Sequence, residues 1–121
     1  MLDTYDMSVS QGATYSRAIS YRDPAGHPID LSGATAAMQV RPFAGDIATP
    51  LLSLTSASHG GITLTTPALA PMFVNIEFSI TATVTAALTP GEYVYDIELN
   101  FGAEVVRLIG GAFSVFAEVT R

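Results

Sequence analysis

A short loop sequence, "DPAGHPID", holds the side chains best suited to bind a metal ion. Asp23, His27 and Asp30 are all possible ligands within this one loop. Zinc needs at least three ligands that converge, and no calcium loop of the D-x-D-x-D-G kind is present. His59 can join them only if strictly alternating strands bring the two loops to the same end of the fold. Because Pro and Gly in this loop are typical of a plain turn, we expect no metal and no cofactor.

Other fragments resemble catalytic motifs only in part. The stretch "SHGGI", which contains His59, Gly60 and Gly61, is similar to the glycine-rich oxyanion loops of esterases, but the G-x-S-x-G elbow that supplies the nucleophile is absent. Asp96 and Glu98 are two residues apart, so a strand would present both on one flat face, without the cleft that shifts two pKa values apart. No phosphate-binding glycine loop is present. The sequence therefore favours a protein that is not an enzyme.

Composition narrows the classes of partner. The chain has 121 residues, a net charge of −6, no Cys and no Lys, and its five basic residues are all Arg. Nucleic-acid binding needs clustered cations, so we expect no nucleic-acid partner. No export signal and no apolar run of about 18 residues occurs, so we also expect no membrane span. Charged residues make up only 13% of the chain, which favours a surface that contacts other protein.

The elements that must carry these residues are short strands rich in Val, Ile, Thr, Tyr and Phe, separated by Pro and Gly. We predict eight of them: Asp3 to Val9, Thr14 to Tyr21, Ala34 to Arg41, Leu51 to Thr55, Ile62 to Thr66, Val74 to Thr81, Glu92 to Leu99, and Val105 to Val119. At "TATVTAAL", a short helical turn competes with a strand. The size and the spacing predict a single all-β domain over residues 1–121, an antiparallel β-sandwich of about seven or eight strands.

Period-two alternation predicts which side chains face the core. The predicted core faces are Ala34, Ala36, Met38 and Val40; Ile76, Phe78 and Ile80; and Tyr93, Tyr95, Ile97 and Leu99. The polar residues between them, Gln39, Arg41, Glu77, Asp96 and Glu98, are expected to point outward. Such half-buried strands are typical of antiparallel sheets packed face to face.

The last hairpin has a predicted register. If its turn centres on Phe101 and Gly102, Asp96 lies opposite Arg107 on the outer face and Ile97 lies opposite Val106 on the inner face. Further along the last strand, the core-facing apolar residues change from even-numbered to odd-numbered positions. A glycine bulge at Gly110 and Gly111 would allow the odd-numbered residues to face the core. The residues that this bulge would bury are Phe113, Val115, Ala117 and Val119.

The stretch "LTPGEYVYDIEL" favours an immunoglobulin-like version of the sandwich. In that fold a Tyr near the start of strand F donates its hydroxyl to backbone a few residues upstream, and Tyr93 is in this setting. Tyr95, two residues later, stands where antibody domains have a disulfide Cys. The predicted domain would therefore depend on packing alone.

Apolar residues in loops suggest a contact surface. In a strictly alternating meander, the first, third, fifth and seventh loops lie at one end, which would collect Phe43, Ile47, Met72, Phe73 and Phe101. Clustered apolar loop tips mark partner surfaces. Two alternatives stay open, since these side chains can instead cover the end of the core, or a crossover between sheets can break the count.

Four segments carry a resemblance to a known family. They are "GHPIDLSGATAAMQVR", "HGGITL", "TAALTPGEYVYDIEL" and "VRLIGGAFSVFAEVTR", which cover most of the chain from Gly26 onward. Together they resemble the small immunoglobulin-like domains of tailed-bacteriophage tails, including the N-terminal domain of the baseplate upper protein of siphophages. These motifs are structural. The chain stops without the coiled-coil or receptor-binding extension of an adaptor with its own fibre, so a fibre-holding role is not implied.

The resemblance implies a structural protein of the virion, assembled in the host cytoplasm, that contacts other virion proteins in the tail, neck or baseplate and forms a homo-oligomer or ring. A capsid decoration protein is one alternative. A second is a host-glycan-binding module, for which the exposed aromatic candidates are Tyr5, Tyr15, Tyr21 and the loop Phe residues. Whether the N-terminal segment from Met1 to Val9 pairs within its own domain or with a neighbour is left open.

Overall fold

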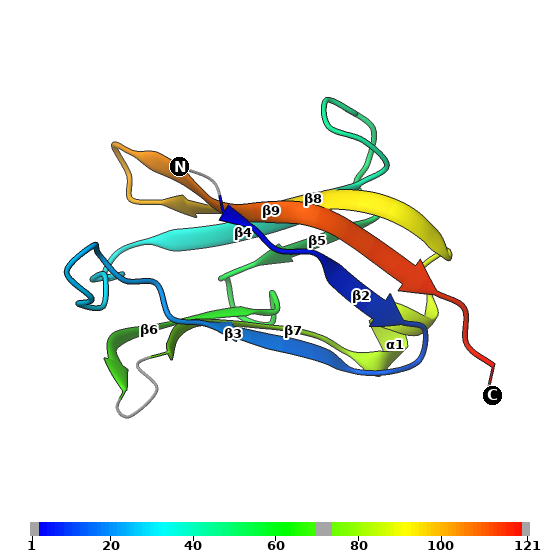
Figure 1. Ribbon diagram of the computed structural model, residues 1–121, viewed down its shortest axis with the longest axis horizontal. Coiled ribbons are helices and arrows are strands. Elements are labelled where there is room, and N and C mark those ends of the chain that lie inside the picture. The colour runs from blue at the N-terminus through cyan, green and yellow to red at the C-terminus, as the bar shows by residue number, and fades with distance from the viewer. Residues whose placement is uncertain (1–2, 70–73, 120–121) are drawn as a thin grey trace.

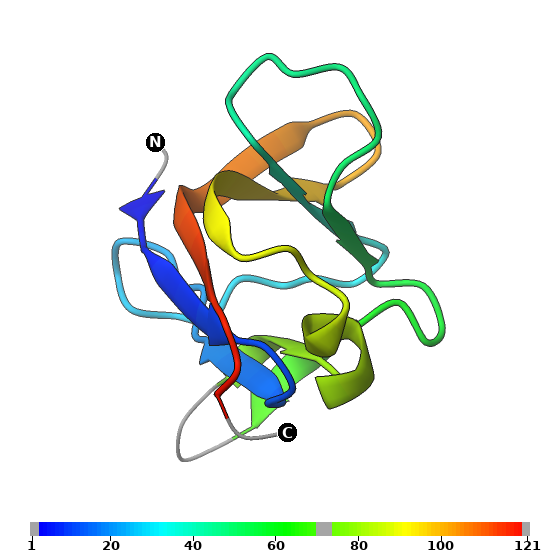
Figure 2. The same cartoon turned by 90° about the vertical axis from the view of Figure 1, so that its right-hand side faces the viewer.

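Two β-sheets and one short helix make up the computed structural model, which describes residues 3–69 and 74–119 (Figure 1). The larger sheet has the strand order β1-β9-β8-β4-β5, with β2 also paired to β9, and the smaller sheet has the order β3-β7-β6. Figure 2 shows the larger sheet curling above the smaller one. The elements are β1 (Asp3–Thr4), β2 (Met7–Ser10), β3 (Tyr15–Ile19), β4 (Thr35–Arg41), β5 (Leu52–Thr55), β6 (Ile62–Leu69), β7 (Val74–Ile80), α1 (Ala82–Ala86), β8 (Gly91–Asn100) and β9 (Val105–Phe116).

The predicted all-β class is confirmed. Seven of the eight predicted strands agree with the structure to within a few residues, whereas the predicted strand from Asp3 to Val9 is divided into β1 and β2. The helical alternative at "TATVTAAL" is correct, because Thr81 caps α1 and its hydroxyl accepts a hydrogen bond from the Val84 N–H at 3.3 Å. The expectation of purely antiparallel pairing is wrong. Both β1 and β2 run parallel to β9, so the N-terminal segment pairs within its own chain in this structure.

The core lies between the two sheets and follows the predicted alternation. Met38 and Val40 from β4, Ile97 and Leu99 from β8 and Ile76 from β7 are all buried. Removing a side chain of this size from water contributes on the order of 1.5–3 kcal/mol to folding. Ala34 and Tyr93, at the ends of their predicted faces, are half-buried and pack against this core. Alternating burial therefore fixes which face of each strand remains available for function.

The predicted register of the last hairpin is wrong. Arg107 lies opposite Glu98, and Asp96 lies opposite Gly110. The difference arises because the connection has four residues, 101–104, closed by a 2.8 Å bond from the Phe101 N–H to the Glu104 carbonyl. Asn100 Oδ1 also accepts a hydrogen bond from the Gly102 N–H at 2.7 Å, which favours the longer turn.

The register shift in β9 comes earlier than predicted. It lies at Leu108, between the pairs Glu98–Arg107 and Ile97–Ile109, and not at the two glycines. Phe113 and Val115 are buried as expected. The other two predicted core residues, Ala117 and Val119, are exposed because β9 ends at Phe116.

Gly111 instead provides space for the N-terminal segment. A Cβ atom at this position would lie 2.7 Å from the Tyr5 carbonyl oxygen and 2.8 Å from Asp6 Oδ1. The Tyr95 hydroxyl donates a hydrogen bond to the same Tyr5 carbonyl, and Asp6 Oδ1 accepts one from the Ala112 N–H at 3.0 Å. Tyr95 therefore fixes the segment between β1 and β2.

The predicted role of Tyr93 is confirmed at the level of its hydrogen bond. Its hydroxyl donates to the Thr89 carbonyl at 2.9 Å, four residues upstream. This bond closes the corner that leads from α1 into β8.

We expect Tyr95→Phe to lower the free energy of unfolding by about 1 kcal/mol at pH 7, because the Tyr5 carbonyl loses its partner. Burial raises the pKa of Tyr95 well above its ordinary value of 10.0. The folded state thus keeps this proton while the unfolded chain loses it, so stability falls as pH rises above about 10, by up to about 1.4 kcal/mol per pH unit. Urea unfolding from pH 7 to about pH 11 should show a shallower alkaline loss in Tyr95→Phe than in the wild type.

Tyr15→Phe is the matched control at pH 7 only, because burial also raises the pKa of Tyr15. The Tyr15 hydroxyl is buried and has no hydrogen-bond partner among the described residues, so its removal should change stability at pH 7 very little. Equal losses at pH 7 in the two variants would contradict the role given to the Tyr95 bond.

Candidate interaction surfaces

The loop with Asp23, His27 and Asp30 forms turns. Asp23 Oδ1 accepts hydrogen bonds from the backbone N–H groups of Ala25 and His27 at 3.0 and 2.9 Å, and the His27 N–H bond is the main cause of the lowered pKa of Asp23. Asp30 Oδ1 accepts from both the N–H and the hydroxyl of Ser32. Within the described residues, no three His, Cys, Asp or Glu side chains are grouped closely enough to hold a metal ion.

His59 also lies in a turn. The Gly60 N–H donates to the Ala57 carbonyl at 2.8 Å, and the Thr55 N–H donates to the Gly60 carbonyl at 2.9 Å. The hydroxyl of Ser58 is 3.2 Å from His59 Nδ1, and both side chains line the rim of an open hollow of about 970 Å³ between β4 and β6. Among the described residues, the lining of this hollow includes no Asp or Glu that could orient His59 as a base.

The predicted cluster of apolar loops is not brought together. Arg41 pairs with Val94 and Thr35 pairs with Asn100, so the β4–β5 loop and the β8–β9 loop lie at opposite ends of β8 (Figure 1). Phe43 and Ile47 are therefore far from Phe101, which packs partly against the core. Met72 and Phe73 lie outside the described residues.

The prediction that alternate loops lie at the same end fails at one place, where the chain crosses from one sheet to the other. The chain passes from β5 in the larger sheet to β6 in the smaller sheet without reversing, as the parallel bridge between Thr55 and Gly61 shows. Every loop after this crossing therefore lies at the opposite end of the fold from the one predicted. This is the crossover alternative that the sequence left open.

A different set of exposed hydrophobic side chains is spread over one end of the molecule, which holds the β4–β5 loop, α1, the start of β8 and the end of β9 (Figure 1). Six of the eight large hydrophobic residues that are exposed in the described chain belong to it. Ile47 and Val119 are almost fully exposed, at 97% and 96%. We call this set the apolar end: Phe43, Ile47, Val84, Val94, Phe116 and Val119.

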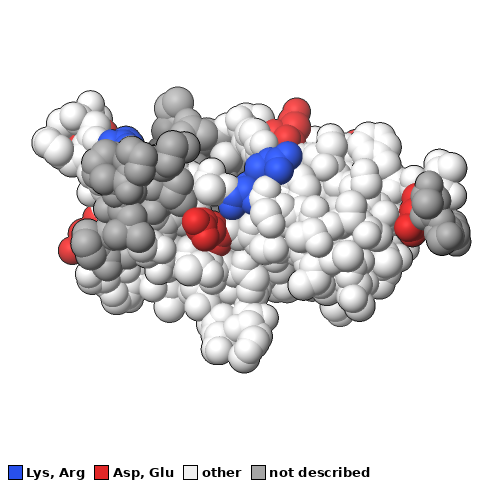
Figure 3. Space-filling view, turned by 90° about the horizontal axis from the view of Figure 1, so that it is seen from below, with Lys and Arg blue, Asp and Glu red and all other residues white. Residues whose placement is uncertain are grey.

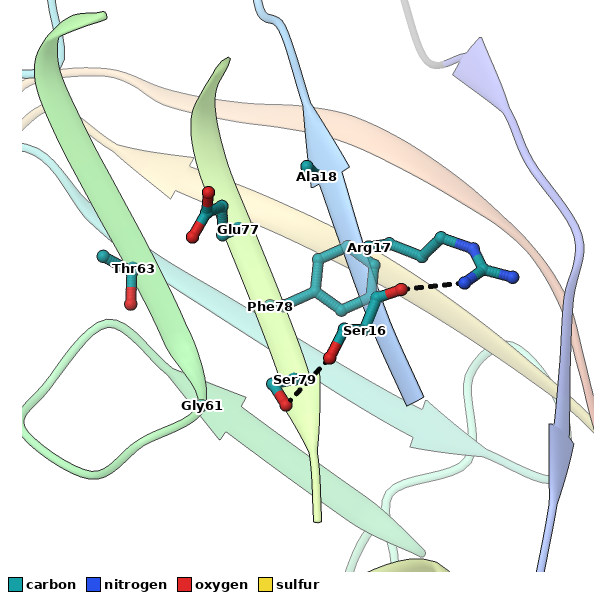
Figure 4. A pocket seen from close by; sticks show the side chains of 8 residues that line it. All are labelled: Ser16, Arg17, Ala18, Gly61, Thr63, Glu77, Phe78 and Ser79. Atoms are coloured by element: carbon teal, nitrogen blue, oxygen red, sulfur yellow. Dashed lines mark hydrogen bonds between the residues drawn. The ribbon is translucent and has the colours of Figure 1, made fainter. Parts of the chain in front are cut away.

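The outer face of the smaller sheet carries few charged side chains (Figure 3). It contains a shallow depression of about 380 Å³ that is lined mainly by small residues of β3, β6 and β7 (Figure 4). There the Ser16 and Ser79 hydroxyls are 3.1 Å apart, and Arg17 donates to the Ser16 carbonyl at 2.7 Å. Arg17 and Glu77 are the two charged side chains in the lining of this depression.

The outer face of the larger sheet bears a second, more polar groove. The β4–β5 loop rises from this face on the side away from the smaller sheet (Figures 1 and 2). Beneath it lies a groove of about 500 Å³, lined by side chains of the loop and of β4, β8 and β9. Arg41 holds the loop in place by donating to the Ala48 carbonyl and, at 2.8 Å, to Gln39 Oε1.

Arg107 joins two carboxylates on the floor of this groove. Its guanidinium lies 3.1 Å from Glu98 Oε2 and 3.4 Å from Asp96 Oδ2. The predicted contact between Asp96 and Arg107 is therefore present, although the two residues are not directly opposite each other. The outward alternation of Gln39, Arg41, Asp96 and Glu98 was visible in the sequence, whereas the loop that turns this flat face into a groove was not.

Comparisons with known proteins leave the family open. No family model matches the chain, and no curated protein shows significant sequence similarity to it. No helix in the described part of the chain is long and apolar enough to cross a bilayer.

Proposed function

We propose that this chain is a non-enzymatic structural protein of a tailed-bacteriophage virion that assembles through protein–protein contacts in the tail, neck or baseplate. The site of assembly in this proposal is the apolar end. The virion is the setting implied by the resemblance of four segments of the sequence to tail proteins.

The strand order supports an immunoglobulin-like sandwich as the scaffold. In such domains strands G, F and C form one sheet, which C′ extends in variable-type domains, and strands B, E and D belong to the other. Here β9-β8-β4-β5 and β3-β7-β6 have these orders, and Tyr93 makes the expected corner bond. The first strands depart from that scheme because they join the larger sheet beside β9.

The observation that carries the proposal is the exposure of large hydrophobic side chains at the apolar end. Leaving Ile47 and Phe116 in water forfeits the hydrophobic free energy that a partner surface would recover. The low charged content of 13% is a second support, because charge is depleted at the centre of protein interfaces. A domain that binds no partner would need neither the exposed hydrophobic residues nor the low content of charged residues.

We expect Phe116→Asp to weaken self-association at least tenfold, since a carboxylate at a buried contact would lose its water without gaining a partner. Light scattering across a concentration series measures this. Val105→Asp is the matched control, because Val105 lies at the other end of the same strand and is exposed to a similar extent, 54% against 52%. It should associate like the wild type.

The proposed virion setting is tested separately, by measuring whether the two variants are incorporated into phage particles. Phe116→Asp should be missing from purified virions that contain Val105→Asp. A wild type that stays monomeric at every concentration would contradict the ring, and would favour a decoration protein that binds only a preformed lattice. Equal incorporation of both variants would contradict the apolar end as the assembly site.

A further inference from the structure

We propose that the groove on the outer face of the larger sheet binds a neutral glycan. The residues that would contact the sugar are Gln39, Arg41, Phe43, Asp96, Glu98 and Arg107. This site is separate from the assembly contacts proposed above, except that Phe43 and Val94 belong to both.

The shape of the groove suits a small chain of sugar rings. Its volume of about 500 Å³ lies within the range of ligand sites. Gly110 and Gly111 contribute no side chain to its floor, and Asp96 lies directly opposite Gly110. The hollow therefore forms because the two glycines leave space at its floor and the β4–β5 loop lies over it. Arg41 holds this loop in place through its hydrogen bond to the Ala48 carbonyl.

The polar groups of the groove match hydroxyl-rich ligands. Carboxylates accept two hydrogen bonds side by side, and the guanidinium group donates several in one plane, so they pair well with neighbouring hydroxyls of a sugar ring. Asp96, Glu98 and Arg107 remain partly open to solvent, with side-chain exposures of 42%, 36% and 61%. Their ion pairs hold the groups in position while leaving capacity for a ligand.

The charges of the groove select against anionic ligands. Two arginines face three carboxylates, namely Asp46, Asp96 and Glu98, and the whole chain has a net charge of −6. A phosphate-rich polymer would need an excess of positive charge. A neutral glycan can instead use both donors and acceptors without an electrostatic penalty.

Phe43 provides the apolar surface that sugar rings need. Phe43 is 60% exposed, and both it and Val94 belong to the lining of the groove. The C–H groups of a pyranose ring can pack on such a face. Loss of this contact should weaken binding about tenfold.

An array of neutral oligosaccharides and purified bacterial wall polysaccharides, followed by calorimetric titration with the strongest soluble binder, tests the proposal. Phe43→Ala should weaken binding about tenfold, and Arg107→Lys should weaken it by a similar factor because the planar guanidinium is lost. Val105→Ala is the matched control, since Val105 is exposed to a similar extent, 54% against 60% for Phe43, but belongs neither to the groove lining nor to the apolar end. It should bind like the wild type.

The outcomes separate this proposal from the assembly function. Absence of any glycan signal, binding of anionic polymers alone, or equal effects of Phe43→Ala and Val105→Ala would each overturn it. Loss of self-association in Arg107→Lys without any glycan binding would identify the groove as a protein contact, and would overturn it as well. Binding of soluble oligosaccharides and of wall polysaccharide, both sensitive to Phe43→Ala, is the expected result.

Discussion

Replacing Asn75 with alanine should lower the free energy of unfolding by about 2–4 kcal/mol, an unusually large effect for a polar residue. Asn75 lies on β7 and is fully buried. Its Oδ1 accepts from the Tyr21 N–H at 2.8 Å, and its Nδ2 donates to the carbonyls of Tyr21 at 2.9 Å and Ile29 at 3.4 Å. Alanine would remove all three bonds and leave the Tyr21 N–H without this acceptor.

Urea unfolding measures this loss, and the other asparagine of the chain provides the control. Asn100 is exposed and makes one local bond to the Gly102 N–H, so Asn100→Ala should cost less than about 1 kcal/mol. Hydrogen exchange should also show that Asn75→Ala loosens the long loop between β3 and β4 before the strands open. Equal losses for the two asparagine variants would show that Asn75 does not anchor that loop.

Asn75 marks the limit of what the sequence could predict. Alternation along β7 placed Ile76, Phe78 and Ile80 in the core, and the structure agrees. The same alternation puts Asn75 on the outer face with Glu77, where a polar side chain is expected to meet water. It is buried because Tyr21 and its loop cover it, and a contact between residues 54 positions apart leaves no local pattern in the sequence.

The same difference between local patterns and contacts of distant residues explains which parts of the candidate surfaces could be predicted. Local rules predicted most of the strands and the corner bond of Tyr93, because each depends on residues close together in the chain. The arrangement of loops was wrong because it depended on one crossing from β5 to β6, where Thr55 and Gly61 form a parallel bridge. The polar groove was missed for a related reason, since its wall is a loop that folds back over a neighbouring strand.

Gly111→Ala should also be strongly destabilising, by about 2–4 kcal/mol, through its effect on the N-terminal segment. The added methyl group would lie 2.7 Å from the Tyr5 carbonyl oxygen, which belongs to backbone that cannot easily move away. Shifting that backbone breaks its bond with Tyr95 and weakens the packing of Met7 and Val9, which are almost completely buried.

A chain that lacks residues 1–6 provides the control for this prediction. It keeps β2 but removes the atoms that the methyl group would meet, so Gly111→Ala should cost much less in this background than in the full chain. Urea unfolding of the four proteins gives the coupling directly. If the substitution costs as much in the shortened chain, the strain lies within β9 and not in its contact with the N-terminal segment.

Release of the N-terminal segment would also change how the protein associates. β1 and β2 cover one edge of β9, and an uncovered strand edge is a template for pairing with another chain. Light scattering of Gly111→Ala should therefore show association that increases with concentration and does not require Phe116. Association can then occur through the free edge of β9 or through the apolar end. The double variant Gly111→Ala, Phe116→Asp distinguishes them, because it should remain associated if the free edge of β9 is responsible. A monomeric double variant would mean that the N-terminal segment stays in place and that the apolar end alone drives assembly.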